Sequence, residues 1–172
     1  MKRLALLLLT CFTLTSVSAQ EAKTGDVESV DAIIAALYDV ISGPAGEKRD
    51  WDRMKSLFIP EGRLIPTFKK PDGKVGYLWW SIQEYIDQAG AGLEKNGFFE
   101  VEVARKQENY GTVVHLFSTY ESRRNLDDEK PFARGINSIQ LMYDSERWWI
   151  MNVFWRGESP DNKIPQAYLP GN

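Results

Sequence analysis

The feature that most constrains the fold is a helix start followed by a run of strand patterns. Ser81-Ile-Gln-Glu84 has the Ser-x-x-Glu spacing of a capping box, and Trp80 and Tyr85 stand at hydrophobic-staple positions beside it. Four strand patterns then follow one another, over residues 98–107, 112–122, 131–144 and 147–156. This order predicts an α+β domain in which one curved antiparallel sheet takes up the C-terminal half.

The N-terminal half predicts two further helices and a hairpin. Apolar residues recur at helical spacing before Gly43-Pro44, which ends the first helix. They are Val30, Ile33, Ile34, Leu37 and Ile41. A short second helix begins after Asp50, which caps it. Strands over residues 63–68 and 75–79 flank the turn Lys70-Pro-Asp-Gly73, so we expect them to pair.

The N-terminus has the pattern of a secretory signal peptide. Lys2 and Arg3 precede an apolar run, and Val17-Ser18-Ala19 supplies the small residues of a cleavage site, so residues 1–19 are expected to be removed after Ala19. The apolar run is short for a membrane anchor. Cys11 leaves a lipoprotein as the alternative, although Thr10 stands where Gly or Ala is usual. We expect a periplasmic or secreted protein that is not attached to the membrane after cleavage.

Cysteine content and charge restrict the chemistry of the mature chain. Cys11 is the only cysteine, so a chain cut after Ala19 has no disulfide and no cysteine-bound metal. His115 is the only histidine, no metal-ligand spacing occurs, and we expect neither a metal nor another cofactor. The mature chain keeps all 24 acidic residues and is mildly acidic. Its basic residues are scattered, so we expect no nucleic acid partner.

The order of helices and strands resembles the NTF2-like superfamily, in its SnoaL-like and ketosteroid-isomerase-like branch. Asp144-Ser-Glu-Arg-Trp-Trp-Ile150 is similar to the family's Asp-Gly-x-Trp-x-Ile turn and last strand. The resemblance covers residues 27–156. It implies a cone in which three N-terminal helices pack on a strongly curved antiparallel sheet, with a pocket inside. Residues 20–26 would then be a mobile leader and residues 157–172 an extended C-terminal tail.

The resemblance implies no single activity, because the fold hosts isomerases, dehydratases, epoxide hydrolases and noncatalytic modules. Ketosteroid isomerase uses a general-base Asp with a Tyr and a protonated Asp. Limonene epoxide hydrolase uses an Asp-Arg-Asp set, and scytalone dehydratase uses His and Asp. None of these sets can be placed on this chain, because the long strands carry few acids in their interiors.

Candidate site residues come from the long strands and the tryptophans. His115 is the candidate for a general base, and the alternative is a hydrogen-bonded strand histidine or one on the outer sheet face. Strand alternation puts Ser118 and Tyr120 on the face opposite His115. In the next strand, Arg134 and Gln140 share one face and Asn137 takes the other. The predicted ligand-binding residues are Trp51, Trp80, Ser118, Tyr120, Arg134 and Gln140.

The charge of the ligand and the oligomeric state depend on which way these side chains face. An arginine in the pocket would favour an anionic ligand such as a carboxylate. Trp148 and Trp149 must face opposite sides of their strand, so one of them adds to the outer sheet face. Such an aromatic face predicts a homodimer through the open sheet, and cover by the C-terminal tail is the alternative.

Three functions are consistent with these patterns. The first is an exported domain that binds a small, largely apolar molecule in the cone without catalysis. The second is a cofactor-independent isomerase, lyase or hydrolase, in which His115, Asp52 or Glu84 would be the base, although Glu84 is engaged in the helix cap. The third is an interaction role for the open sheet face. We rank them in this order.

Overall fold

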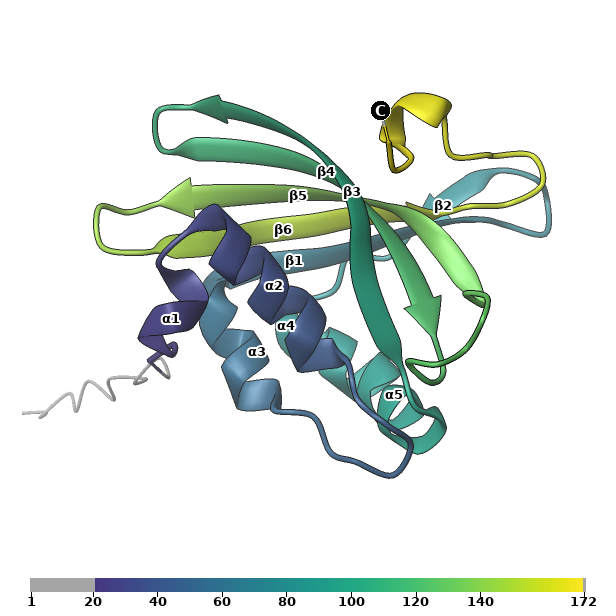
Figure 1. The fold of residues 1–172 in the computed structure, drawn as a ribbon, viewed down its shortest axis with the longest axis horizontal. Coiled ribbons are helices and arrows are strands. Elements are labelled where there is room, and N and C mark those ends of the chain that lie inside the picture. The colour runs from purple at the N-terminus through teal and green to yellow at the C-terminus, as the bar shows by residue number, and fades with distance from the viewer. Residues whose placement is uncertain (1–20, 172) are drawn as a thin grey trace, which may run out of the picture.

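The computed structural model describes residues 21–171, and the predicted signal peptide with Cys11 lies outside these residues. Within the described range the strands form one six-stranded sheet in the order β2-β1-β6-β5-β4-β3. The strands are β1 (Phe58–Lys69), β2 (Val75–Tyr77), β3 (Phe99–Tyr110), β4 (Val113–Arg123), β5 (Ala133–Tyr143) and β6 (Trp148–Gly157). The sheet twists and bends strongly, and the helices cover one of its faces (Figure 1). The predicted α+β cone is therefore confirmed.

Strand pairing follows the sequence prediction except between β1 and β6. β3, β4, β5 and β6 pair antiparallel in chain order, and β1 and β2 form the predicted hairpin. β1 pairs with β6 in parallel, which the sequence analysis did not foresee. β1 also begins at Phe58, ahead of the predicted strand, and the register shifts between Phe58 and Arg63. Pro60 and Gly62 lie in this irregular stretch, where a strand departs from regular pairing.

The helices begin and end where their capping residues stand. α2 (Val30–Ile41) is capped by Ser29, and α3 (Trp51–Leu57) by Asp50. A one-turn helix, α1 (Thr24–Val27), forms within the segment expected to be a leader, and Asp26 of this turn is ion-paired with Arg53 at 2.7 Å. Within residues 21–171, no helix has the length and apolar composition that crossing a membrane would require.

The third predicted helix is continuous but changes its winding. It runs through α4 (Ile82–Tyr85), a π-helical segment (Ile86–Gly90) and α5 (Ala91–Asn96). Both hydrogen bonds of the predicted capping box at Ser81 and Glu84 are present. The staple rings of Trp80 and Tyr85 meet edge to face, with centroids 6.3 Å apart. The π-helical segment ends at Gly90, where an added Cβ would lie 3.1 Å from the ring of Trp51, so this glycine lets α3 approach closely.

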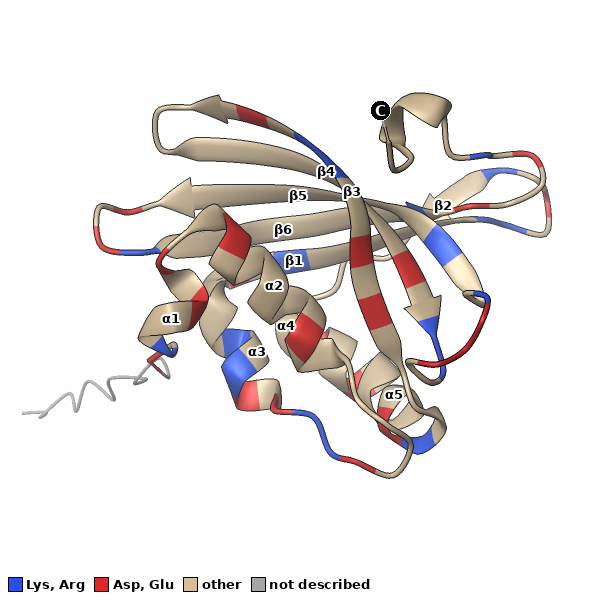
Figure 2. Ribbon diagram, viewed as in Figure 1, with Lys and Arg blue, Asp and Glu red and all other residues tan. Residues whose placement is uncertain are grey.

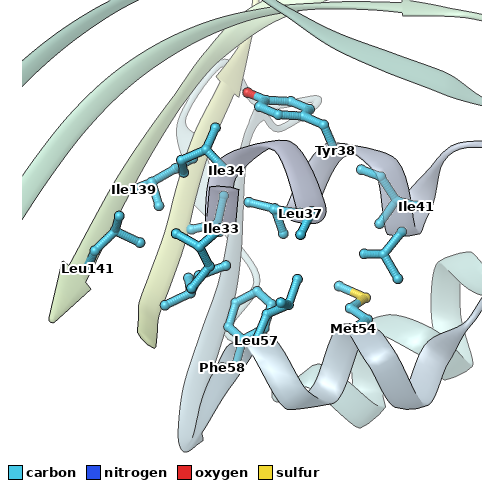
Figure 3. Close-up of a cluster of buried hydrophobic side chains, with 14 of the residues drawn as sticks. Ile33, Ile34, Leu37, Tyr38, Ile41, Met54, Leu57, Phe58, Ile139 and Leu141 are labelled. Atoms are coloured by element: carbon cyan, nitrogen blue, oxygen red, sulfur yellow. The ribbon is translucent and has the colours of Figure 1, made fainter. Parts of the chain in front are cut away.

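The core lies between the helices and the inner face of the sheet. Ile33 and Ile34 of α2, Leu57 of α3, and Ile139 and Ile150 of the sheet are almost fully buried. Figure 3 shows side chains from α2 and α3 packed toward strands of the sheet, with the ring of Tyr38 lying on the sheet side of α2. This apolar cluster fills one part of the cone.

The C-terminal tail lies on the outer face of the sheet, opposite the helices (Figure 1). A short 3-10 turn at Gln166–Tyr168 contacts β3 and β4. Thr119 donates a hydrogen bond to the backbone oxygen of Tyr168 at 2.7 Å, and the rings of Phe117 and Tyr168 meet edge to face. Part of the outer face is therefore covered by the chain itself.

Candidate functional site

A cavity of about 280 Å³ lies inside the cone, between the helices and the inner sheet face. We call it the Glu100 cavity, after the only charged residue among those that line it. Phe132, which is half exposed, lies at its rim. The lining residues are Leu37, Tyr38, Ile41, Met54, Leu64, Tyr85, Leu93, Phe98, Glu100, Tyr120, Ser122, Phe132, Ala133, Asn137, Val153 and Trp155. The surface is mostly apolar and aromatic, with a few polar groups that converge on Glu100.

Glu100 stands near the start of β3, and two neutral side chains donate hydrogen bonds to its carboxyl group. Ser122 Oγ donates to Oε2 at 2.9 Å, and Asn137 Nδ2 donates to Oε1 at 3.4 Å. Burial raises the pKa of the Glu100 carboxyl to about 7, and the two hydrogen bonds oppose that rise. Glu100 therefore changes its charge near neutral pH, which suits both ligand binding and proton transfer.

Three tyrosines lie close enough to this carboxyl group for its charge to act on them. Burial is the main reason that the pKa values of Tyr38, Tyr85 and Tyr120 are raised above the usual value, and the nearby Glu100 charge adds to the shift. Their phenols stay protonated at any physiological pH. Tyr120 has space at the sheet because its partner in β5 is Gly135, where an added Cβ would lie 2.5 Å from the Tyr120 hydroxyl.

A chain of hydrogen bonds holds Asn137 in position beside Glu100. Asn137 Nδ2 also donates to the hydroxyl of Tyr38 at 3.1 Å, and this hydroxyl lies 2.6 Å from Ser118 Oγ. Ser118 in turn donates to Glu102 Oε1. Asn137 Nδ2 can only donate, so the Tyr38 hydroxyl accepts from it and donates its own hydrogen to Ser118 Oγ. These hydrogen bonds therefore all point toward the Glu102 carboxylate.

Glu102, the last acceptor in this series of hydrogen bonds, is also part of an ion-pair network. Arg105 forms ion pairs with Glu102 and with Asp31 of α2, both at 2.6 Å. Figure 2 shows acidic positions on the half of β3 that runs toward α5. β3 therefore brings two carboxyl groups to the inner side. Glu102 forms an ion pair with Arg105, whereas Glu100 forms no ion pair with Arg105.

Among the predicted ligand-binding residues, Tyr120 lines the cavity and Ser118 lies directly behind Tyr38. The alternation that placed both on one face is confirmed by their burial. Trp51 and Trp80 do not line the Glu100 cavity. Trp51 packs under Gly90 and donates to Glu94 Oε1 at 2.9 Å, while Trp80 is paired through its backbone with Leu64.

Arg134, Gln140 and His115 all lie on the outer side of the sheet. Arg134 forms an ion pair with Glu158 at 2.8 Å, and Gln140 accepts a hydrogen bond from Asn152. His115 Nε2 lies 2.9 Å from Ser138 Oγ. Asn137, Ile139 and Leu141 take the inner positions of β5, so alternation turns Arg134 and Gln140 outward. The structure therefore brings neither an arginine nor the histidine to the cavity.

Three residues of the site were not recognised from the sequence: Glu100, Tyr38 and Ser122. Glu100 alternates with Phe99 and Val101, which showed that it takes the opposite face but not that this face is the inner one. Tyr38 was not counted in the predicted stripe of α2, although it stands four residues after Ile34 and three before Ile41, and this helical spacing was the available signal. Within residues 21–171, no group of three His, Cys, Asp or Glu side chains is arranged to hold a metal ion.

Three solved structures show which fold this is. A protein of unknown function with a cystatin-like fold from Nostoc punctiforme matches with a TM-score of 0.57 and 11% identity, over 76% of this chain and 90% of that chain. A calcium/calmodulin-dependent protein kinase II association domain-like protein from Xanthomonas campestris has a TM-score of 0.55 and 14% identity, covering 76% and 86%. A scytalone dehydratase-like protein from Novosphingobium aromaticivorans has a TM-score of 0.53 and 12% identity, covering 83% and 91%.

Fold and site together define an α+β protein in which a bent sheet and its helices enclose one acid-containing, aromatic cavity. The chain shares the fold of these structures, the NTF2-like cone that its resemblance predicts. No protein-family model matches the sequence, and no curated protein matches it. At these identities the similarity extends to the fold alone, so a function has to be argued from the cavity.

Proposed function

We propose that this chain is an exported protein that binds a small, largely apolar molecule in the Glu100 cavity. The observation that carries the proposal is a preformed concave site with apolar walls and a few convergent polar groups, which is the usual form of a small-molecule site. Export rests on the N-terminal sequence, and a mature chain that begins at Gln20 in native cells would support it. The homodimer through the outer sheet face stays a prediction, and the tail on that face limits the area it has.

Filling the cavity should abolish binding while the fold is kept. Ala133 lines the cavity at the start of β5, where it is only partly buried, so Ala133→Phe can place a ring inside without distorting the core. We expect wild-type protein to enhance the fluorescence of the neutral dye N-phenylnaphthylamine, and Ala133→Phe to lose at least about tenfold in affinity.

The matched control is Val113→Phe, which adds the same ring to an exposed position of β4. It should bind the dye like wild type, and circular dichroism should show both variants folded. Equal binding by all three proteins would place the dye on the outer surface. That result, or no binding by wild type, would contradict the proposal.

Acid–base catalysis in the same cavity is the second candidate. It is favoured by one observation, the carboxyl group of Glu100 with a pKa of about 7 among three protonated tyrosines. A general base works best when its pKa is near the working pH, and phenols can donate to a developing oxyanion. This assigns the role of base to Glu100, in place of His115, Asp52 or Glu84.

A generic test of such a base is the ring opening of nitrobenzisoxazole. The carboxylate takes the carbon-bound proton, the N–O bond breaks, and a cyanophenolate forms without a cofactor. We expect a rate that rises with pH to a plateau with a midpoint near 7, and that is lost in Glu100→Gln. A rate no higher than that of acetate at the same concentration would leave binding without catalysis as the function.

A further inference from the structure

The Glu100 cavity contains a carboxyl group and no side chain that can neutralise it. Its lining residues include no Lys, Arg or His. The hydrogen-bond donors to Glu100, Ser122 and Asn137, are both neutral. A carboxylate in a largely apolar site is unfavourable without a cation, so ionised Glu100 would be stabilised by a positive charge from outside the protein.

Arg105, Arg124 and Arg134 do not line the cavity and make contacts elsewhere. Arg105 is ion-paired with Glu102 and Asp31. Arg124, beside the rim, lies over the ring of Phe132 at 4.2 Å and donates to the backbone oxygen of Gly97. Arg134, which would have favoured an anionic ligand, is on the outer side with Glu158. An anion inside the cavity would therefore meet the Glu100 carboxyl group, and no basic residue lines the cavity to bind it.

The walls of the cavity also favour a cation. Six of the lining residues are aromatic: Tyr38, Tyr85, Phe98, Tyr120, Phe132 and Trp155. The face of an aromatic ring carries partial negative charge and attracts ammonium groups, most strongly where water is excluded. Aromatic walls around a single carboxylate form a common type of site for alkylated ammonium ions, whose methyl groups are apolar and whose net charge is positive.

We propose that the ligand of the Glu100 cavity is a small organic cation, an amine or quaternary ammonium with an apolar body, whose charge pairs with Glu100. This inference rests on the proposed binding function and narrows its ligand class. The groups that face Glu100 from the packed elements are Tyr38 of α2, Tyr85 of α4, Tyr120 of β4 and Asn137 of β5. None of these changes charge between pH 6 and 8, so Glu100 alone sets the pH dependence there.

Binding of a permanent cation should therefore strengthen as Glu100 ionises. With a pKa of about 7, the ionised fraction of Glu100 rises about tenfold from pH 6 to pH 8, and the affinity should rise by a similar factor. Below the pKa, binding should release a proton to the buffer. A neutral ligand of the same shape should show no such increase.

The test uses three probes that displace N-phenylnaphthylamine: benzyltrimethylammonium, its neutral carbon isostere neopentylbenzene, and phenylacetate. For wild type we expect benzyltrimethylammonium to bind at least about tenfold more tightly than neopentylbenzene at pH 8, and phenylacetate to be the weakest. Glu100→Gln should lose both the preference and the pH dependence. Glu108→Gln, at an exposed position of the same strand, should keep both.

Equal affinities for the cation and its neutral isostere would overturn the inference, and so would a preference that survives in Glu100→Gln. In either case binding of the neutral probe and its loss in Ala133→Phe would leave the proposed function intact. If neither the dye nor any probe binds, the proposed function fails together with the inference.

Discussion

Glu100→Gln is expected to stabilise the protein at pH 8 by about 2 to 3 kcal/mol and to remove much of its pH dependence. The pKa of Glu100 is raised from 4.5 to about 7 in the folded protein, because burial disfavours the charged form. Between pH 4.5 and pH 7 the Glu100 carboxyl group is mostly ionised in the unfolded chain and mostly protonated in the folded protein. The stabilisation from this group is therefore complete below about pH 4.5 and is lost as the pH rises through 7. Glutamine stays neutral throughout, so it keeps the stabilisation.

Urea unfolding of wild type and Glu100→Gln at pH 5, 6, 7 and 8 measures this difference. The two proteins should have similar free energies of unfolding at pH 5 and diverge as the pH rises, up to about pH 8. Glu108→Gln is the matched control, because Glu108 is exposed on the same strand, and it should follow wild type within about 0.5 kcal/mol at every pH. Parallel curves for wild type and Glu100→Gln would show that Glu100 ionises like an exposed carboxyl group.

Arg49→Ala is expected to cost about 3 to 4 kcal/mol of unfolding free energy, the largest loss we predict from a single substitution. Arg49 is 7% exposed, and its guanidinium donates to backbone oxygens at the end of α2, in the following loop and in α5. The acceptors include Ile41 at 3.2 Å, Glu47 at 2.6 Å and Leu93 at 3.3 Å. Without the guanidinium, several carbonyl groups would be left buried without a donor.

Two further variants separate hydrogen bonding from charge at this position. Arg49→Lys keeps the positive charge but has one ammonium group in place of a planar fork, so we expect a loss of about 1 to 2 kcal/mol. Lys48→Ala, at the exposed neighbouring position, should change the free energy of unfolding by less than about 0.5 kcal/mol. A loss in Arg49→Ala no greater than in Lys48→Ala would mean that the loop is held by other contacts.

The helix starts and the strand order could be read from the sequence because local signals encode them. Asp50 and Ser81 cap the second and third helices as the sequence predicts, and Ser29 caps the first. Alternation correctly placed Ser118 and Tyr120 on one face of β4, opposite His115, and both are buried. The parallel pairing of β1 with β6 joins segments far apart in the chain, and no local pattern specifies such a contact.

The centre of the site was missed because alternation gives two faces without saying which one is inside. In β3 the apolar residues lie on the more exposed face, and Val101 is 39% exposed. Glu100 takes the inner face, where polar partners surround it: Ser42, the residue after α2, accepts a hydrogen bond from the Glu100 backbone N–H through its Oγ at 3.0 Å. Tyr38 and Asn137 complete the polar surroundings. A carboxyl group held in this way becomes recognisable only after the tertiary contacts are known.

The position of β6 has a consequence for how the chain reaches its native state. β6 is the last strand in the sequence, yet it lies between β1 and β5 and supplies Ile150, which is completely buried. The N-terminal helices and β1 therefore cannot pack against a complete sheet until β6, residues 148–157, has been synthesised and has paired. Folding should be a late, all-or-none event governed by long-range contacts, and slow for a chain of this size. A chain that ends before Trp148 should stay unfolded and remain a substrate for proteases and chaperones.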